Sequence, residues 1–266
     1  MRMKEKKYKL KFKELREQIA QHKSVFVVYV VLRLLVILAM VISFLSGNYE
    51  NLFLCGLSLI LFLVPAFIQS NFGIELPSTL EILILLFIFA AEILGEMESF
   101  YIKYAFWDTM LHTINGFLCA AVGFALLDFI NRNSKVKFKL SPVYLSIVAF
   151  CFSMTIGVLW EFFEFSWDFF FHTDMQKDFV VNSIYSTALD PLKSNKAIAV
   201  TGIEDVLVNG EELGVGGYLD IGLFDTMKDL FVNFIGAVVF SIIGYFYIKQ
   251  RGKSKFASRF IPKIKE

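Results

Sequence analysis

Residues 24–45 read SVFVVYVVLRLLVILAMVISFL, and Arg33 is the only charged side chain among them. An α-helix needs about 20 mostly apolar residues to cross the hydrocarbon layer of a bilayer, so this stretch is long enough to span one. Apolar residues make up 56% of the 266-residue chain, which is more than the core of a soluble domain of this size can bury. The sequence therefore predicts an integral membrane protein whose helices face lipid.

Five further stretches have a similar length and composition. The six expected spans are residues 24–45, 51–70, 78–97, 108–130, 140–170 and 225–248. The predicted fold class is all-α, a polytopic membrane protein with six transmembrane helices and a small extracellular loop subdomain. The transmembrane domain, residues 24–248, includes the outer loop 171–224 and is flanked by basic segments at residues 1–23 and 249–266.

The basic residues predict the orientation of these spans. Nine lie in residues 1–23, four in residues 132–139 and seven in residues 249–265, so the three segments hold 20 of the 26. Short loops rich in lysine and arginine stay on the cytoplasmic side, and six spans put all three segments on one side. We therefore expect a multi-pass plasma-membrane protein with both basic ends in the cytoplasm and the loop 171–224 outside.

The outer loop contains eight carboxylates and three lysines. Within it, Val208-Asn209-Gly210-Glu211 has the composition of a two-residue hairpin turn between apolar residues. The sequence favours a small β-hairpin near Ile203 to Tyr218 that could serve as a lid.

Polar side chains gather where three spans reach the outer face. A charged side chain costs about 2.5 kcal/mol or more at the centre of a spanning helix, and less toward the interface. Spacings of three and four residues place the groups of each span on one helical face, so we expect them to converge in one hollow open to the exterior. From the fourth, fifth and sixth spans they are Asp108, His112 and Asn115; Glu161, Glu164 and Asp168; and Asp225, Asp229 and Asn233.

Carboxylates combined with one imidazole suit a hard or borderline divalent ion such as Mg²⁺, Mn²⁺ or Zn²⁺. The same groups can act as general acid and base. The catalytic candidates are Glu161, Glu164, Asp229 and His112. The candidate metal ligands are Asp108, His112, Glu161, Glu164, Asp168, Asp225 and Asp229, with Asn115 and Asn233 as further polar groups.

These residues also have structural explanations. Asp108 and Asp225 begin helices, where a carboxylate caps backbone N–H groups. Glu161, Glu164 and Asp229 lie within helices and could instead hold the bundle together through interhelical hydrogen bonds. The sequence has no contiguous metal motif such as HExxH, no phosphate-binding loop and no serine nucleophile motif. Any site has to be assembled from several helices.

The polar motifs carry a family resemblance. The patterns are Asp108-x-x-x-His112, Glu161-x-x-Glu164 and Asp229-x-x-x-Asn233-x-x-Gly236. Over roughly residues 107–245 the chain resembles the YjdF-like uncharacterised bacterial inner-membrane proteins and, more distantly, the VanZ-like proteins linked to glycopeptide-antibiotic tolerance. It departs from the VanZ-like pattern in its long outer loop and extra N-terminal spans. The resemblance supports the polar site and implies no particular reaction.

Three functions fit the sequence. The first is a metal-dependent or acid/base enzyme that acts on a lipid-linked or cell-envelope substrate at the outer face. The second is a non-catalytic envelope-protection or scaffold protein whose carboxylates only order the helices. The third is a transporter that couples to a cation or a proton, although the polar groups stop about halfway into the bundle. The expected partners are the lipid bilayer and the envelope substrate, and no nucleic acid is expected.

Overall fold

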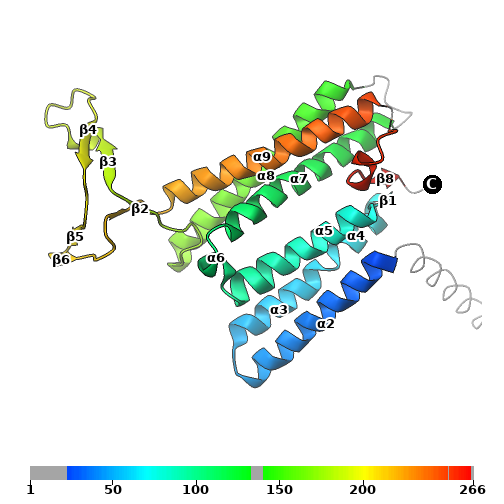
Figure 1. The fold of residues 1–266 in the computed structure, drawn as a ribbon, viewed down its shortest axis with the longest axis horizontal. Helices are drawn as coiled ribbons and strands as arrows, with labels where there is room; N and C mark the ends of the chain where they lie inside the picture. Colours follow the sequence, from blue (N-terminus) through cyan, green and yellow to red (C-terminus); the bar gives the residue numbers. More distant parts are fainter. Residues whose placement is uncertain (1–22, 133–139, 251, 265–266) are drawn as a thin grey trace, which may run out of the picture. The chain divides into compact units, whose positions relative to one another are not determined.

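A computed structural model describes residues 23–132, 140–250 and 252–264 of the chain (Figure 1). The chain is mostly helical, and six of its helices are long and apolar enough to cross a membrane. Their bounds are Lys23–Leu45, Tyr49–Asn71, Ser78–Met97, Trp107–Asn131, Pro142–Phe171 and Leu223–Lys249. Each bound lies within two residues of its predicted position, so the six-span prediction is confirmed.

The chain folds into two compact units. The first contains residues 1–154 and 233–266, and the second contains residues 155–232. Two long helices, α8 (Pro142–Phe171) and α9 (Leu223–Lys249), each contribute to both units.

The first unit begins with three helices that contact one another. Helix α2 (Lys23–Leu45) packs against α3 (Tyr49–Leu61) and α5 (Ser78–Phe89) around a core that includes Val36 and Phe62. The remaining elements of this part are α4 (Val64–Phe72), β1 (Ile74–Glu75), the π-helix η1 (Ala90–Met97) and α6 (Phe100–Lys103).

The outward faces of these helices are apolar. Along α2, the side chains of Leu34, Leu38 and Leu45 are 61%, 58% and 78% exposed. Exposed leucine is costly in water but costs nothing against acyl chains. The surface of the helices therefore fits a lipid bilayer.

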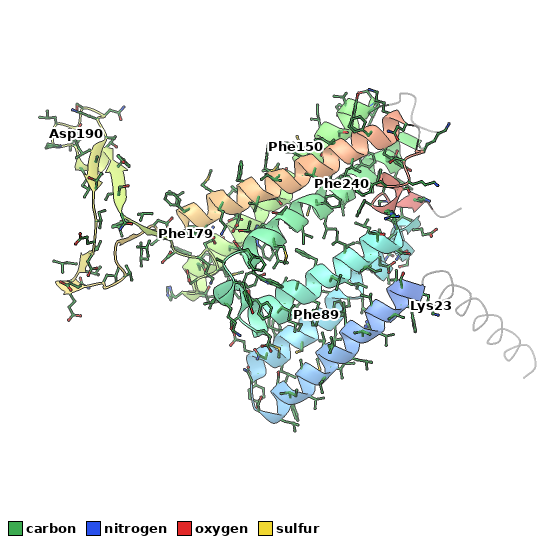
Figure 2. The ribbon with its side chains drawn as sticks, viewed as in Figure 1. Lys23, Phe89, Phe150, Phe179, Asp190 and Phe240 are labelled. Carbon is green, nitrogen blue, oxygen red and sulfur yellow. The ribbon has the colours of Figure 1, made fainter. Side chains whose placement is uncertain are left out.

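A second core lies where α7 (Trp107–Arg132) meets α9 and the start of α8. Phe124 and Phe240 are fully buried there, and Phe240 is labelled in Figure 2. The Phe240 ring packs edge-to-face against Phe117 with ring centroids 5.1 Å apart. Gly116 and Gly236 let α7 and α9 approach closely, because a methyl group at either position would overlap the backbone oxygen of Asn233 or Thr113. Small residues at such crossings are typical of membrane helices.

The chain beyond α9 folds back onto the same unit. It forms a 3₁₀ turn, η3 (Ala257–Arg259), and a short strand, β8 (Lys263–Ile264). Strand β8 pairs antiparallel with β1, so that Ile74 lies opposite Ile264 and Glu75 opposite Lys263. The basic segment predicted as a tail therefore has a defined structure over its described residues.

The second unit consists of the outer ends of α8 and α9 and the loop between them. Three antiparallel strand pairs form in this loop, together with a 3₁₀ turn, η2 (Thr187–Leu189). The pairs are β2 (Val180–Val181) with β7 (Tyr218–Leu219), β3 (Ser183–Ser186) with β4 (Ile198–Thr201), and β5 (Leu207–Val208) with β6 (Glu211–Glu212).

The predicted hairpin is the β5–β6 pair. Val208 lies opposite Glu211, and the two turn residues Asn209 and Gly210 have φ of 55° and 90°. Positive φ at both central residues is what a type I′ turn requires and what Asn-Gly supplies. The hairpin is confirmed, and the two other strand pairs are additions to it.

Candidate functional site

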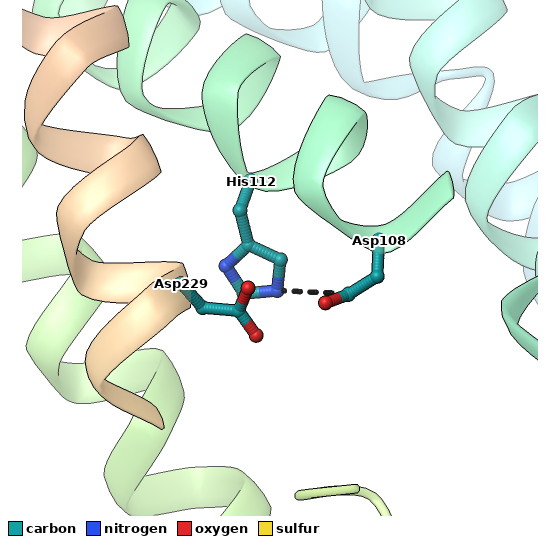
Figure 3. A group of neighbouring side chains, drawn as sticks. All are labelled: Asp108, His112 and Asp229. Carbon is teal, nitrogen blue, oxygen red and sulfur yellow. Dashed lines mark ion pairs between the residues drawn. The ribbon is translucent and has the colours of Figure 1, made fainter. Parts of the chain in front are cut away.

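The first polar group lies at the start of α7. Trp107 donates its indole N–H to the carbonyl oxygen of Ala90 at 3.3 Å, which ties the beginning of α7 to η1. One turn separates Asp108 from His112, and His112 Nε2 lies 3.4 Å from Asp108 Oδ1 (Figure 3). His112 is buried, and the Asp108 carboxylate is partly exposed beside it. The predicted i, i+4 pair is therefore present.

A polar network lies deeper in the same unit. Asn115 Nδ2 and Asn233 Oδ1 are 3.5 Å apart, and the amide of Asn233 also lies 3.5 Å from the carbonyl oxygen of Ser153. The Ser153 hydroxyl donates to the Gly116 carbonyl at 2.7 Å. Asn233 is 1% exposed, so it joins α7, α8 and α9 inside the bundle. Both predicted asparagines thus contribute to helix packing.

The α8 carboxylates belong to the second unit. Glu161 and Glu164 are 4% and 8% exposed. The indole N–H of Trp160 donates to Glu164 at 2.8 Å, and the side-chain amide of Gln176 lies 3.5 Å from Glu161. Burial of two carboxylates near the end of a spanning helix is costly, so both are fixed by specific donors.

Asp168 has a different role from these two. One of its oxygens accepts hydrogen bonds from the Thr173 hydroxyl at 2.8 Å and the Met175 N–H at 2.6 Å, and the other accepts from the Gln176 N–H at 2.8 Å. These bonds close the chain over the end of α8. Asp168 therefore orders the entry to the outer loop.

The α9 carboxylates surround a lysine. Lys228 Nζ lies 2.7 Å from Asp225 Oδ1 and 3.7 Å from Asp229 Oδ1, and 5.3 Å from the centre of the Phe179 ring. Asp225 and Asp229 are 3% and 1% exposed. Asp225 also accepts the Lys177 N–H at 2.9 Å. The pair is thus held by a cation from its own helix and by the returning loop.

Gln176 connects the two helices of this unit. Its side-chain amide reaches Glu161 on α8 and donates to the Thr226 hydroxyl on α9 at 2.7 Å. The structure therefore brings the acidic ends of α8 and α9 together through one loop residue. The convergence of the α7 pair with these carboxylates stays a prediction.

Two residues of the site were not predicted. Lys228 stands three residues after Asp225, a spacing that places the two side chains on one helical face, so the sequence contained its signal. Gln176 lies in a loop without a periodic pattern, and nothing in the sequence marks it as a link between helices.

Beyond the site, the outer loop has its own acidic anchors. Asp190 accepts hydrogen bonds from the hydroxyl and N–H of Ser194 and from the N–H groups of Leu192 and Lys196. These bonds, above all that from the Ser194 hydroxyl, hold the pKa of Asp190 below its ordinary value. Asp178 behaves oppositely, because partial burial and then the nearby carboxylates, first that of Asp174, raise its pKa.

Comparison with known proteins places the chain in a family. The model of a family described as "Predicted membrane protein (DUF2238)" matches residues 28–250, most of the chain. No curated protein and no solved structure matches the chain. The YjdF-like resemblance is confirmed because the YjdF-like proteins are this family, and the resemblance to VanZ-like proteins stays a prediction. The chain therefore belongs to the DUF2238 family of predicted membrane proteins.

Proposed function

We propose that this multi-pass membrane protein binds a divalent cation at its Asp/Glu/His cluster and acts there on a lipid-linked or cell-envelope substrate. The observation that carries the proposal is the burial of four carboxylates on the parts of α8 and α9 in the second unit, Glu161, Glu164, Asp225 and Asp229, which are all less than 9% exposed. Side chains that are costly to bury at a membrane surface are seldom kept without a use.

Charge supports a cation as the ligand. At the ends of α8 and α9 within the second unit, Lys228 offsets one of the four buried carboxylates, so four minus one leaves a formal excess of three negative charges when all are ionised. A divalent cation would reduce that excess to one. Gln176 contacts Glu161 on α8 and Thr226 on α9, next to Asp225, and these contacts support a shared acidic site for Glu161 and the α9 carboxylates.

The donor set fits Mg²⁺, Mn²⁺ or Zn²⁺. Carboxylate oxygens are the usual ligands of the first two ions, and an imidazole ligand extends the set to zinc. Glu161 and Asp229 are the proposed central ligands, and Asp108 and His112 remain candidate ligands from the sequence prediction alone. A bound ion would polarise a substrate oxygen or lower the pKa of a water molecule. Glu164 would then hold or transfer a proton, because the Trp160 indole fixes its orientation.

The proposed setting is a bacterial cytoplasmic membrane with the cluster and the loop 171–224 on the outside. The placement of basic residues along the sequence supports this orientation. The eight carboxylates of the loop favour a neutral or cationic substrate group, and a phosphate group would require the metal to offset repulsion.

Metal analysis of the purified full-length protein tests the proposal. We expect one equivalent of Mn²⁺ or Zn²⁺ to remain bound after loading and desalting. Asp229→Asn and Glu161→Gln each remove one ligand and should lower the metal affinity at least about tenfold, which corresponds to about 1.4 kcal/mol of binding free energy. Glu212→Gln is the matched control, because Glu212 lies exposed on β6 and far from the helix ends in sequence. A wild-type protein that holds no metal would refute the proposal.

A scaffold function is the second candidate, and Lys228 favours it. Its ammonium already neutralises Asp225 and contacts Asp229, as it would in a purely structural pair. If the cluster only holds helices together, Lys228→Gln should lower the free energy of unfolding by about 1–3 kcal/mol, the cost of a buried charge losing its partner, and added divalent ions should not restore it. If the cluster binds metal, divalent ions should recover much of the loss.

The matched control for that variant is Lys177→Gln. Lys177 pairs with Asp174, whose side chain is 62% exposed, and exposed pairs contribute about 0–1 kcal/mol. Thermal melting in detergent, with and without Mn²⁺, separates the two functions.

A further inference from the structure

The chain after α9 carries a concentrated positive charge in a fixed place. The fold-back segment, residues 252–264, contains Lys253, Lys255, Arg259 and Lys263 and no acidic residue. All four side chains are exposed. Across the described part of the chain, none of them lies within ion-pair distance of a carboxylate.

Packing holds this segment against the helices. Gly252 has a φ of 74° and its N–H bonds to the Tyr247 carbonyl at 2.9 Å, which ends α9 and turns the chain back. Ala257 and Ile261 are 2% and 0% exposed, and the Phe260 ring packs edge-to-face on Phe117 of α7 at 5.3 Å. The backbone then pairs with β1. The positive charges are therefore attached to an ordered backbone.

The segment lies at one end of the spanning helices. Strand β1 connects α4 to α5, which belong to consecutive spans, so it occupies the surface of the bilayer on that side. Because β8 pairs with β1 (Figure 1), the fold-back segment runs along the same surface. Its cations then lie at the depth of lipid headgroups.

One exposed aromatic residue also indicates that the segment lies at the membrane surface. Phe256 is 59% exposed although its neighbour Phe260 packs into the bundle. Exposed phenylalanine beside lysine and arginine is the composition of segments that rest in the interface of an anionic membrane. A segment that merely marks the cytoplasmic side needs the charge but neither the ordered backbone nor the exposed ring.

We infer that the fold-back segment is a binding surface for the headgroups of anionic phospholipids, with Lys253, Lys255 and Arg259 as the main contacts and Phe256 in the interface. Lys263 contributes less, because Glu75 lies opposite it in the strand pair. This inference is independent of the metal site and of which leaflet the segment faces.

Lipid titration of the full-length protein in detergent tests the inference, with bound lipids counted by native mass spectrometry. We expect phosphatidylglycerol to bind more tightly than phosphatidylcholine. Each juxtamembrane cation strengthens attachment to anionic lipid about fivefold, so the triple variant Lys253→Gln, Lys255→Gln, Arg259→Gln should lose about 100-fold in affinity for phosphatidylglycerol. Its melting temperature with phosphatidylcholine should not change, because Ala257, Phe260 and Ile261 are untouched.

The matched control removes the same charge elsewhere. Lys103→Gln, Lys193→Gln, Lys196→Gln replaces three exposed lysines outside the segment and should retain the preference. Equal losses in both triple variants, or no loss in the first, would overturn the inference. Wild-type protein gives a second test that needs no substitution: the preference should fall steeply between about 0.1 and 0.5 M NaCl as the charges are screened, and a preference indifferent to salt, or absent, would also overturn it.

Discussion

Lys228, whose side chain is 30% exposed, places a positive charge beside two buried carboxylates of its own helix. Its ammonium contacts Asp225 and Asp229, so the site contains a resident cation. Any external cation has to compete with it or bind beside it. The sequence shows Lys228 plainly but cannot show which way a long flexible side chain turns, because that depends on the Phe179 ring and on the loop that returns to Asp225.

The stability of the outer loop around Asp190 should decrease in acid. Its pKa is lower in the folded chain than in the unfolded chain, so its stabilising effect is present above the unfolded value of about 3.9 and is lost as the pH falls through the folded value. We expect hydrogen-exchange protection of residues 190–196, corrected for intrinsic rates, to be constant from about pH 8 to 5 and to fall below about pH 4.

The Asp190→Asn variant identifies the group responsible. It should have low protection of the same amides throughout this pH range and no further decrease in acid. An acid-dependent decrease that survives in the variant would show that another group controls the turn.

The element that most depends on close packing is the crossing of α7 and α9. A methyl group at Gly116 would overlap the backbone of Asn233, and the Ser153 hydroxyl bonds to the Gly116 carbonyl beside it. We expect Gly116→Ala to lower the free energy of unfolding by about 1–3 kcal/mol, the usual cost of overpacking a core, and so to lower the melting temperature. Thermal unfolding in detergent measures it.

Gly56→Ala is the matched control for that crossing. Gly56 lies within α3, and a Cβ there would have no atom within 4 Å. Alanine should leave the stability unchanged or raise it by up to about 1 kcal/mol through helix propensity. Equal effects of the two substitutions would show that the α7–α9 contact is looser than the structure indicates.

Sequence reasoning was most reliable for elements with a strong local cause. The spans follow from runs of apolar residues, and the β5–β6 hairpin follows from Asn209-Gly210, whose positive φ values few other residues adopt. The pair β3–β4 joins residues separated by a loop, and η1 departs from α-helical geometry within an ordinary apolar run. Neither the β3–β4 pairing nor the π-helical geometry of η1 has a local sequence pattern, so neither could be predicted without the structure.

At the scale of the whole molecule, orientation is the testable consequence of the charge distribution. In a chain whose natural cysteines, Cys55, Cys119 and Cys151, are replaced by alanine, Leu192→Cys should react with a membrane-impermeant maleimide in intact cells. Leu192 is 83% exposed in the outer loop. Lys135→Cys should react only after lysis, because it belongs to a basic segment expected in the cytoplasm.

Labelling of Lys135→Cys in intact cells would reverse the orientation and move the carboxylate cluster to the cytoplasmic face. The sequence predicted the fold class and the membrane setting, because both depend on bulk hydrophobicity. Of the polar residues named from the sequence, six are buried and three, Asp108, Asn115 and Asp168, are partly exposed; the buried ones are His112, Glu161, Glu164, Asp225, Asp229 and Asn233. The partners of these residues depend on loop geometry, which no helical spacing encodes.

The pairing of β8 with β1 has a consequence for biosynthesis. Residue 264 leaves the ribosome roughly ten to forty seconds after residue 75 at ordinary translation speeds of about 5–20 residues per second. During that interval Leu76 and Leu80, which the finished chain covers with Ala257 and Ile261, have no cover from that segment. A nascent chain stalled before residue 257 is thus inserted in the membrane but lacks the segment that covers Leu76 and Leu80. Membrane proteases that recognise exposed apolar surfaces should cleave the chain most readily at this stage.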